Sequence, residues 1–234
     1  MHGTNPIRHS EVQASGSFLS VQEIFYTIQG EGPQSGCRAV FIRLAGCNLA
    51  CAFCDTEFES GMSNRLSIPE IIDQVAKHPH ELVVLTGGEP MRQNVEPLIV
   101  ALHAEIGVRL VQIETAGTIY QDCMTWPGVQ VVCSPKTVKI HPHVAAFCIH
   151  YKYVIESGRI SDDDGLPCFG TQPATREERQ QIFRPDLRTR NIYVSPCDTG
   201  IDTVNEANRK VAAAVAMRYG YRLSLQVHKL TGLP

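Results

Sequence analysis

The stretch G-C-N-L-A-C-A-F-C-D, residues 46–55, places three cysteines, Cys47, Cys51 and Cys54, in one short loop. Three thiolates from one loop can each hold one iron of a cubic 4Fe–4S cluster, and the fourth iron then lacks a protein ligand and stays open for chemistry. A ferredoxin-type site uses four thiolates, and a structural zinc site closes its shell with four ligands. The spacing therefore predicts an iron–sulfur cluster with one open iron.

The composition of the whole chain is that of an ordinary globular protein. Its 234 residues are 43% hydrophobic and 19% charged, and the formal net charge is −3. This charge gives no electrostatic case for binding nucleic acid or a membrane surface. No segment is long and apolar enough to cross a bilayer and the N-terminal residues lack an apolar signal core, so we expect a cytoplasmic protein. We expect a polar, mobile arm over residues 1–18 and a single domain over residues 19–234.

The remaining six cysteines are predicted to be reduced, because nothing indicates secretion. Most of them should be small buried hydrophobic side chains. Cys37 precedes the cluster loop, but a predicted strand separates it from that loop, so it is not expected to be a ligand. The six are Cys37, Cys123, Cys133, Cys148, Cys168 and Cys197.

Apolar, β-branched runs alternate with helical patterns, which predicts an α/β fold with parallel strands and crossover connections. Six such strands are too few for an eight-stranded barrel, so we predict a partial, open (β/α)6 barrel, with an added N-terminal strand at 20–28 and a further strand at 222–226. No good helix is expected between residues 134 and 147. The six strands are 39–44, 82–85, 108–113, 129–133, 148–155 and 191–194, and the helices are 68–77, capped by Ser67, 95–106 and 203–219, which ends before Gly220.

Polar or glycine-rich motifs follow five of these strands. Ligands bind at the carboxyl ends of parallel strands, so five such loops predict one pocket. Glu114 at a buried strand end would be costly unless it is paired, which favours a functional role. The motifs are the cysteine loop, T-G-G-E-P at 86–90, E-T-A-G-T at 114–118, S-P-K at 134–136 and S-P-C-D at 195–198.

From residue 21 to residue 234 the chain resembles the 7-carboxy-7-deazaguanine synthase family, which belongs to the radical S-adenosylmethionine enzymes. The cysteine loop alone indicates only the superfamily of radical S-adenosylmethionine enzymes. The narrower resemblance rests on four pieces of sequence. They are F-Y-T-I-Q-G-E-G-P at 25–33, the cysteine pattern C-x3-C-x2-C-D-T, the strand-end motifs and the terminal L-Q-V-H-K-L-T-G-L-P.

The resemblance implies a lyase of queuosine (7-deazapurine) biosynthesis that uses a 4Fe–4S cluster, S-adenosylmethionine and Mg²⁺. Reductive cleavage of S-adenosylmethionine yields a 5′-deoxyadenosyl radical that takes hydrogen from 6-carboxy-5,6,7,8-tetrahydropterin. The ring contracts, ammonia is lost and 7-carboxy-7-deazaguanine forms, without a protein side chain as acid or base. The resemblance also implies a flavodoxin- or ferredoxin-type reductant and a homodimer.

The resemblance also implies a role for individual residues of this chain. Thr56 would bind Mg²⁺, and the apolar residues of the tail would order Pro234, whose carboxylate would contact the substrate. The family more often has Gln-Pro where Ser195-Pro196 stands. The implied substrate contacts are Ile28, Gln29, Gly30, Arg43, Thr86 and Pro234, and the implied S-adenosylmethionine contacts are Phe53, Cys54, Asp55, Gly88, Glu89, Glu114, Ser134, Pro135, Lys136, Ser195, Pro196, Cys197 and Asp198.

Two alternatives remain open at this point. A small radical S-adenosylmethionine activase would share the cluster loop and the fold but would form a glycyl radical on a partner protein, which leaves residues 25–33 and the tail unexplained. A zinc-binding interaction module would use the three clustered cysteines, with Cys37 as a further candidate ligand.

Overall fold

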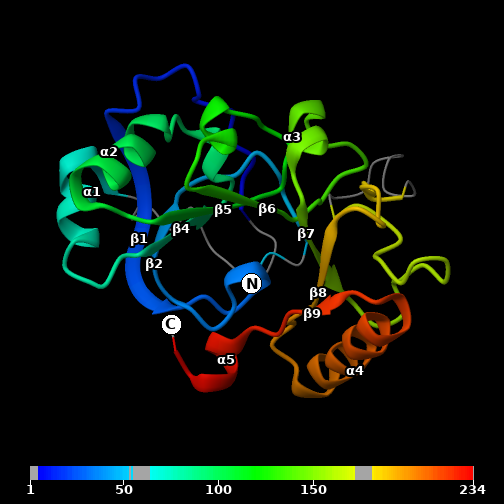
Figure 1. Cartoon of the computed structure of the whole chain (residues 1–234). Coiled ribbons are helices and arrows are strands. Elements are labelled where there is room, and N and C mark those ends of the chain that lie inside the picture. Colours follow the sequence, from blue (N-terminus) through cyan, green and yellow to red (C-terminus); the bar gives the residue numbers. More distant parts are fainter. Residues whose placement is uncertain (1–4, 53, 55–63, 172–180, 234) are drawn as a thin grey trace.

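One nine-stranded sheet runs through the computed structural model, which describes residues 5–52, 54, 64–171 and 181–233 (Figure 1). Its strand order is β3-β1-β2-β4-β5-β6-β7-β8-β9. All pairings from β2 to β9 are parallel, whereas β1 pairs antiparallel with both β2 and β3. The described strands therefore form an open sheet and not a closed barrel, as the sequence predicted.

The strands and helices alternate along most of the chain. The strands are β1 (Phe18–Ile28), β2 (Arg38–Leu44), β3 (Asn64–Ser67), β4 (Leu82–Gly87), β5 (Leu110–Thr115), β6 (Val129–Cys133), β7 (His150–Ile155), β8 (Asn191–Pro196) and β9 (Arg222–Leu223). The helices are α1 (Ile68–Val75), α2 (Glu96–Ile106), α3 (Pro142–Phe147), α4 (Asp202–Tyr219) and α5 (Val227–Thr231), with 3-10 turns η1 (Gly32–Gln34), η2 (Pro90–Arg92) and η3 (Asp122–Thr125).

The six predicted parallel strands are confirmed as β2, β4, β5, β6, β7 and β8, with ends that differ by up to two residues. The predicted helices are confirmed as α1, α2 and α4. Ser67 caps α1 in a reciprocal arrangement with Glu70, and Gly220 ends α4 in the left-handed conformation at φ 73°.

Three elements were not predicted. Strand β3 is polar, and it exists because it pairs with β1 rather than because of its own hydrophobic pattern. Helix α3 was expected to be absent because its region contains prolines. Pro142 instead occupies the first turn of α3, where a missing N–H costs nothing, after a cap from the His141 ring. Helix α5 lies in the tail, to which the sequence analysis assigned no secondary structure.

The two faces of the sheet have different surroundings because side chains alternate along each strand. On β2, Ile42 and Leu44 belong to the main hydrophobic core, and on β4 Val83 and Leu85 do the same. Helices α1 and α2 lie side by side against this face, and α4 packs beside β8 and β9 (Figure 1). The other alternate positions of the same strands face away from this core.

Ala39, Leu82 and Val84 at those alternate positions form a second, small hydrophobic cluster, and the positions nearer the carboxyl ends of the strands are polar. They include Arg43 on β2, Thr86 on β4, Glu114 on β5, Lys152 on β7 and Ser195 on β8, and all five line one cavity. The fold thus places a polar row on the face of the sheet opposite the core. Among the described helices, none is long and apolar enough to span a membrane.

Candidate active site

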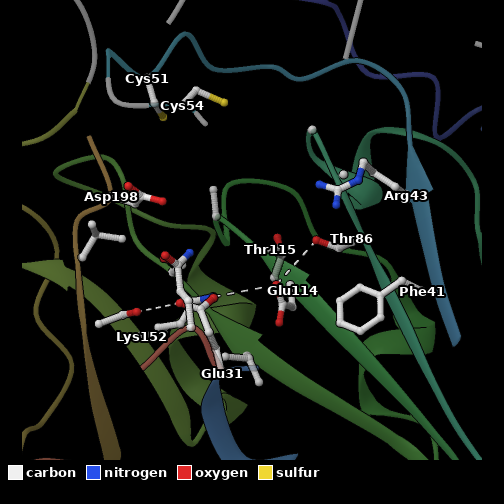
Figure 2. A pocket seen from close by; sticks show the side chains of 18 of the residues that line it. Glu31, Phe41, Arg43, Cys51, Cys54, Thr86, Glu114, Thr115, Lys152 and Asp198 are labelled. Atoms are coloured by element: carbon white, nitrogen blue, oxygen red, sulfur yellow. Dashed lines mark hydrogen bonds and ion pairs between the residues drawn. The ribbon is translucent and has the colours of Figure 1, made fainter. Parts of the chain in front are cut away.

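One cavity of about 520 Å³ lies over the polar face of the sheet, and its size is that of a small-molecule site. It joins the cysteine loop, the strand ends and the tail. Figure 2 shows Cys51 and Cys54 at one end of the cavity, with Glu31 and Lys152 at the other and Arg43, Thr86 and Phe41 along one side. The predicted site residues that line it are Ile28, Gln29, Arg43, Cys47, Cys51, Cys54, Thr86, Gly88, Glu114, Ser134, Lys136, Ser195, Pro196, Cys197 and Asp198.

Other predicted site residues do not line the cavity or lie outside the described residues. Within the described part of the chain, the lining does not include Gly30, Glu89 or Pro135. Phe53, Asp55, Thr56 and Pro234 lie outside the described residues, so the predictions for them, including the magnesium ligand, stay predictions.

The two glycines of the T-G-G-E-P motif hold the cysteine loop close to the sheet. A Cβ at Gly87 would come within 2.1 Å of the Leu44 carbonyl oxygen, and one at Gly88 within 2.0 Å of the Gly46 carbonyl oxygen. Gly87 also has φ 129°, which side-chain-bearing residues rarely adopt. The motif is therefore required for the close approach of two backbone segments beside the cysteines.

Cys47 is the buried member of the three cysteines, and Cys51 and Cys54 are half-buried. Burial, with the nearby Glu89, Cys51 and Cys54, raises the pKa of Cys47 to about 12. Cys47 would bind a metal as its thiolate, and coordinated iron would supply the positive charge that stabilises a thiolate at this buried place. Among residues 5–52, 54, 64–171 and 181–233, no group of three His, Cys, Asp or Glu side chains is placed so that it could bind a single metal ion. A cluster does not require this, because each thiolate binds a different iron.

Glu89 organises the site from inside the protein. Its carboxylate accepts hydrogen bonds from the backbone N–H groups of Met91 (3.0 Å) and Ala116 (2.8 Å) and from the Thr115 hydroxyl (2.8 Å). Burial raises the pKa of Glu89 despite these three donors. The side chain is 1% exposed, so it links the loops after β4 and β5 instead of reaching into the cavity.

Glu114 is paired within the cavity, as its burial at a strand end requires. Its carboxylate accepts hydrogen bonds from the Gln29 amide at 2.9 Å and the Thr86 hydroxyl at 3.5 Å, and lies 3.8 Å from the Lys152 ammonium. Gln29 and Thr86 are predicted substrate contacts. Glu114 was predicted to contact the cofactor, but its hydrogen bonds come from two residues that were predicted to contact the substrate (Figure 2).

A buried ion pair between Lys152 and Glu31 completes this end of the cavity. The Lys152 ammonium lies 2.6 Å from the Glu31 carboxylate, which also accepts a hydrogen bond from the Ser195 hydroxyl at 2.6 Å. Burial alone would raise the pKa of Glu31, but the charge and hydrogen bond of Lys152 and the Ser195 hydroxyl outweigh it, and the pKa is lowered. Sequence reasoning missed both residues: Glu31 lies in the quoted 25–33 motif but was not predicted as a site residue, and the signal for Lys152 was a lysine within a largely apolar parallel strand.

Arg43 reaches the cavity from β2. Its Nε lies 2.6 Å from a Glu23 carboxylate oxygen, and its guanidinium lies over the Phe25 ring, 5.4 Å from the centroid. Both neighbours come from β1, which pairs with β2. These contacts orient a guanidinium beside the cavity, where it can bind a carboxylate with two parallel hydrogen bonds.

The tail covers one side of the cavity, and its apolar residues are buried to different extents: Leu225 and Val227 are half-buried, whereas Leu233 is 40% exposed. Leu230 is 62% exposed, so the predicted apolar ordering of the tail is wrong for this residue. Polar contacts replace it: Lys229 lies 2.7 Å from Asp198, and the Val227 N–H donates to the Gly30 carbonyl at 3.3 Å. Gln226, His228, Lys229 and Leu233 line the cavity.

Comparison with known proteins agrees with this geometry. The sequence profile of the Radical SAM superfamily matches residues 41–124, which include the cysteine loop and the next two strand ends. A crystal structure of QueE from Escherichia coli superimposes with a TM-score of 0.64, covering 94% of this chain and 99% of that one. At 23% identity this likeness concerns the fold alone. Fold, profile and cysteine loop together define a radical S-adenosylmethionine enzyme.

Proteins of similar sequence identify the family within this class of enzymes. A 7-carboxy-7-deazaguanine synthase from Rhodospirillum rubrum is 46% identical over 98% of both chains. One from Rickettsia prowazekii is 36% identical over 100% of this chain and 96% of its own, and one from Bordetella pertussis is 42% identical over 92% and 99%. The chain belongs to the 7-carboxy-7-deazaguanine synthase family.

Proposed function

We propose that this protein converts 6-carboxy-5,6,7,8-tetrahydropterin into 7-carboxy-7-deazaguanine, as a radical S-adenosylmethionine lyase of queuosine biosynthesis. The observation that carries the proposal is the cavity itself, in which the three cysteines and the Glu31, Lys152 and Glu114 group share one enclosed space. Such a cavity holds a cofactor and a small polar ring together. Family membership supports the same reaction.

Cys47, Cys51 and Cys54 would hold the 4Fe–4S cluster. When bound, the cluster supplies the electron that cleaves S-adenosylmethionine and so starts the radical chemistry. The protein residues that would bind S-adenosylmethionine lie around the cysteines: Gly88 after β4, Ser134 and Lys136 after β6, and the 195–198 segment after β8. Lys136 donates to the Ser134 hydroxyl at 2.6 Å, and burial lowers the pKa of Lys136.

The substrate end recognises a flat ring with amide-like edges. Carboxylates accept hydrogen bonds from the ring N–H and amino groups of a pterin. Glu114 and Glu31 line the cavity near Gln29 and Thr86, whereas a third lining carboxylate, Asp198, belongs to the 195–198 segment. Gln29 and Thr86 hold Glu114 in place. Arg43 would bind the substrate carboxylate, because a guanidinium pairs with a carboxylate through two hydrogen bonds. We place Glu114 at the boundary between substrate and cofactor.

Several finer parts of the proposal rest on the family resemblance. They are Mg²⁺ bound through Thr56, the Pro234 carboxylate as a substrate contact, a flavodoxin- or ferredoxin-type reductant and a homodimer. One hydroxyl is a weak protein site for Mg²⁺, but this ion usually keeps waters and takes ligands from its substrate.

An anaerobic assay of the reconstituted protein tests the function. The protein is given S-adenosylmethionine, a reductant and 6-carboxy-5,6,7,8-tetrahydropterin, with and without Mg²⁺, and formation of 7-carboxy-7-deazaguanine is followed. We expect product that requires the cluster and increases with Mg²⁺, and none from Cys51→Ala. A brown wild-type protein with about four irons per chain excludes the zinc alternative. Absence of the deazaguanine product from such a protein would refute the proposal and favour the activase.

A further inference from the structure

Each of the three cluster cysteines accepts a hydrogen bond, and the donors come from three separate segments of the chain. The backbone N–H of Leu49 lies 3.4 Å from the Cys47 sulfur, within the loop itself. The hydroxyl of Thr171 lies 3.0 Å from the Cys51 sulfur, and the side-chain amide of Asn5 lies 3.7 Å from the Cys54 sulfur. Two of the three donors are therefore side chains from far outside the cysteine motif.

Thr171 is held in place by backbone contacts on both sides of its hydroxyl. Its N–H donates to the Lys136 carbonyl at 3.0 Å, and its carbonyl accepts from the Ala52 N–H at 3.2 Å. The first contact joins it to the loop after β6, and the second joins it to the cysteine loop. The main chain of Thr171 is thus held between these two loops, and its hydroxyl has as acceptors the Cys51 sulfur at 3.0 Å and the more distant Lys136 carbonyl at 3.5 Å.

Asn5 is brought to Cys54 by the described part of the N-terminal arm. Ile7 pairs with Cys47 in a parallel bridge, and the Arg8 N–H donates to the Cys47 carbonyl at 2.7 Å. The buried Arg92 side chain then donates to the His9 carbonyl at 2.7 Å and to the Glu11 carboxylate at 2.8 Å. These contacts run along the arm from residue 7 to residue 11.

Arg92 also contacts the cysteine loop, so it joins the arm to that loop. A Cβ at Gly46 would come within 2.9 Å of the Arg92 guanidinium, and an Arg92 nitrogen lies 3.5 Å from the Ala45 carbonyl oxygen. The arm is therefore anchored on the segment that carries the cysteines. Asn5 lines the cavity at the end of this anchored segment.

We propose that Thr171 and Asn5 are positioning residues that raise the reduction potential of the cluster held by Cys47, Cys51 and Cys54. Adding an electron makes a cluster more negative, and a donor aimed at a ligand sulfur stabilises the more negative state. Hydrogen bonds to the sulfurs are one of the levers that set the potential of an iron–sulfur cluster. The inference rests on the cluster of the proposed function, but not on the identity of the substrate.

The test is a redox titration of the full-length, reconstituted protein, followed by the electron paramagnetic resonance signal of the reduced cluster, without S-adenosylmethionine. Thr171→Val keeps the shape of the side chain and removes the donor. We expect its ratio of reduced to oxidised cluster at a fixed potential to fall about tenfold, which is about 59 mV for one electron. Asn5→Leu should lower the ratio less, because its donor is 3.7 Å from sulfur and that of Thr171 is 3.0 Å.

Two controls separate this effect from a loss of structure. Thr171→Ser retains the hydroxyl and should keep the wild-type potential. Thr125→Val removes a hydroxyl that bonds the Asp122 carbonyl on an exposed turn, and it should also leave the potential unchanged. If Thr171→Val fails to load iron, the potential of Asn5→Leu decides the question alone.

The outcomes for the inference and for the proposed function are distinct. Fully loaded Thr171→Val and Asn5→Leu proteins with the wild-type potential would overturn the inference and leave the reaction untouched. Shifted potentials in a protein that forms no deazaguanine would support the inference and refute the reaction. A wild-type protein that binds no iron would refute both.

Discussion

The Lys152–Glu31 pair shows how a single residue can serve both stability and the site. Both side chains are largely buried, with exposed fractions of 10% and 14%. Breaking a buried pair leaves one charge without compensation, which typically costs about 3–5 kcal/mol. Lys152→Met should lower the free energy of unfolding at pH 7 by about this amount, as measured by urea denaturation. The matched control is Arg38→Met, whose pair with Glu81 is more than half exposed and should cost less than about 1 kcal/mol.

The cost of Lys152→Met should depend on pH. The pKa of Glu31 is lowered below its ordinary value of 4.5, so its ionised form contributes stability above that pH and loses this contribution as the pH falls through the folded-state pKa. In the variant, the carboxyl lacks its counter-charge and is better tolerated when protonated. The difference between wild type and variant should therefore shrink as the pH is lowered from 7 through 4.5. A difference that stays constant over this range would show that Glu31 is not ionised in the native protein.

At the scale of residues, sequence reasoning found the members of motifs and missed their partners. Gln29, Arg43 and Thr86 lie in recognisable motifs or at strand ends, and all three line the cavity. Lys152 lies in no motif, and its partner Glu31 is 121 residues away in sequence. Pairing of this kind depends on which segments become neighbours in the folded protein. A local sequence pattern does not contain this information.

At the scale of elements, the strands and helices that were predicted correctly are those whose own sequence shows a clear hydrophobic pattern. The strand at 129–133 has the predicted bounds, and the other parallel strands are close to them. Elements that depend on a partner were missed: β3 forms by pairing with β1, and α5 has no buried residue to give it a hydrophobic pattern. Helix α5 is instead positioned by the loop after β1.

The contact between α5 and that loop can be tested at Gly30. A Cβ at this position would come within 2.1 Å of the His228 ring, so Gly30→Ala should displace α5 and weaken substrate binding. We expect the KM for the pterin to rise about tenfold or more, which corresponds to about 1.4 kcal/mol or more. Cleavage of S-adenosylmethionine without substrate should change less, because in the described part of the chain α5 contacts the proposed cofactor residues through the pair of Lys229 with Asp198.

The double variant Gly30→Ala/His228→Ala provides the control for this prediction. Removing the His228 ring makes room for the new methyl group, so the double variant should bind the pterin better than Gly30→Ala alone. A double variant as impaired as the single one would show that the ring does not set the position of α5. His228→Ala alone measures any direct contribution of the ring to binding.

At the scale of the whole molecule, both described ends of the chain lie at the same cavity. Asn5 borders it near Cys54, and Leu233 borders it just after the end of α5. The sequence predicted the tail at the pocket from the family resemblance, whereas the arm was expected to be mobile. The arm pairs directly with Cys47 through Ile7 and Arg8, and it is also bound by Arg92, which lies in a turn 81 residues beyond Glu11. The sequence of the polar N-terminal segment alone does not predict these contacts.

The convergence of the two ends leads to a prediction about tags. A short Gly-Ser extension after Pro234 retains every native residue but moves the terminal carboxylate to the end of the extension. The described cavity lining reaches Leu233. If that carboxylate binds substrate, losing one charged hydrogen bond of about 1.5–3 kcal/mol should raise the KM for the pterin about ten- to hundredfold. Cleavage of S-adenosylmethionine without substrate should stay at the wild-type rate. The same extension placed before Met1 serves as the control, because it leaves the anchored residues 5–11 in place and should change neither quantity. An unchanged KM with the C-terminal extension would remove the terminal carboxylate from the substrate site and leave Arg43, Glu114 and Glu31 as the groups that hold the pterin.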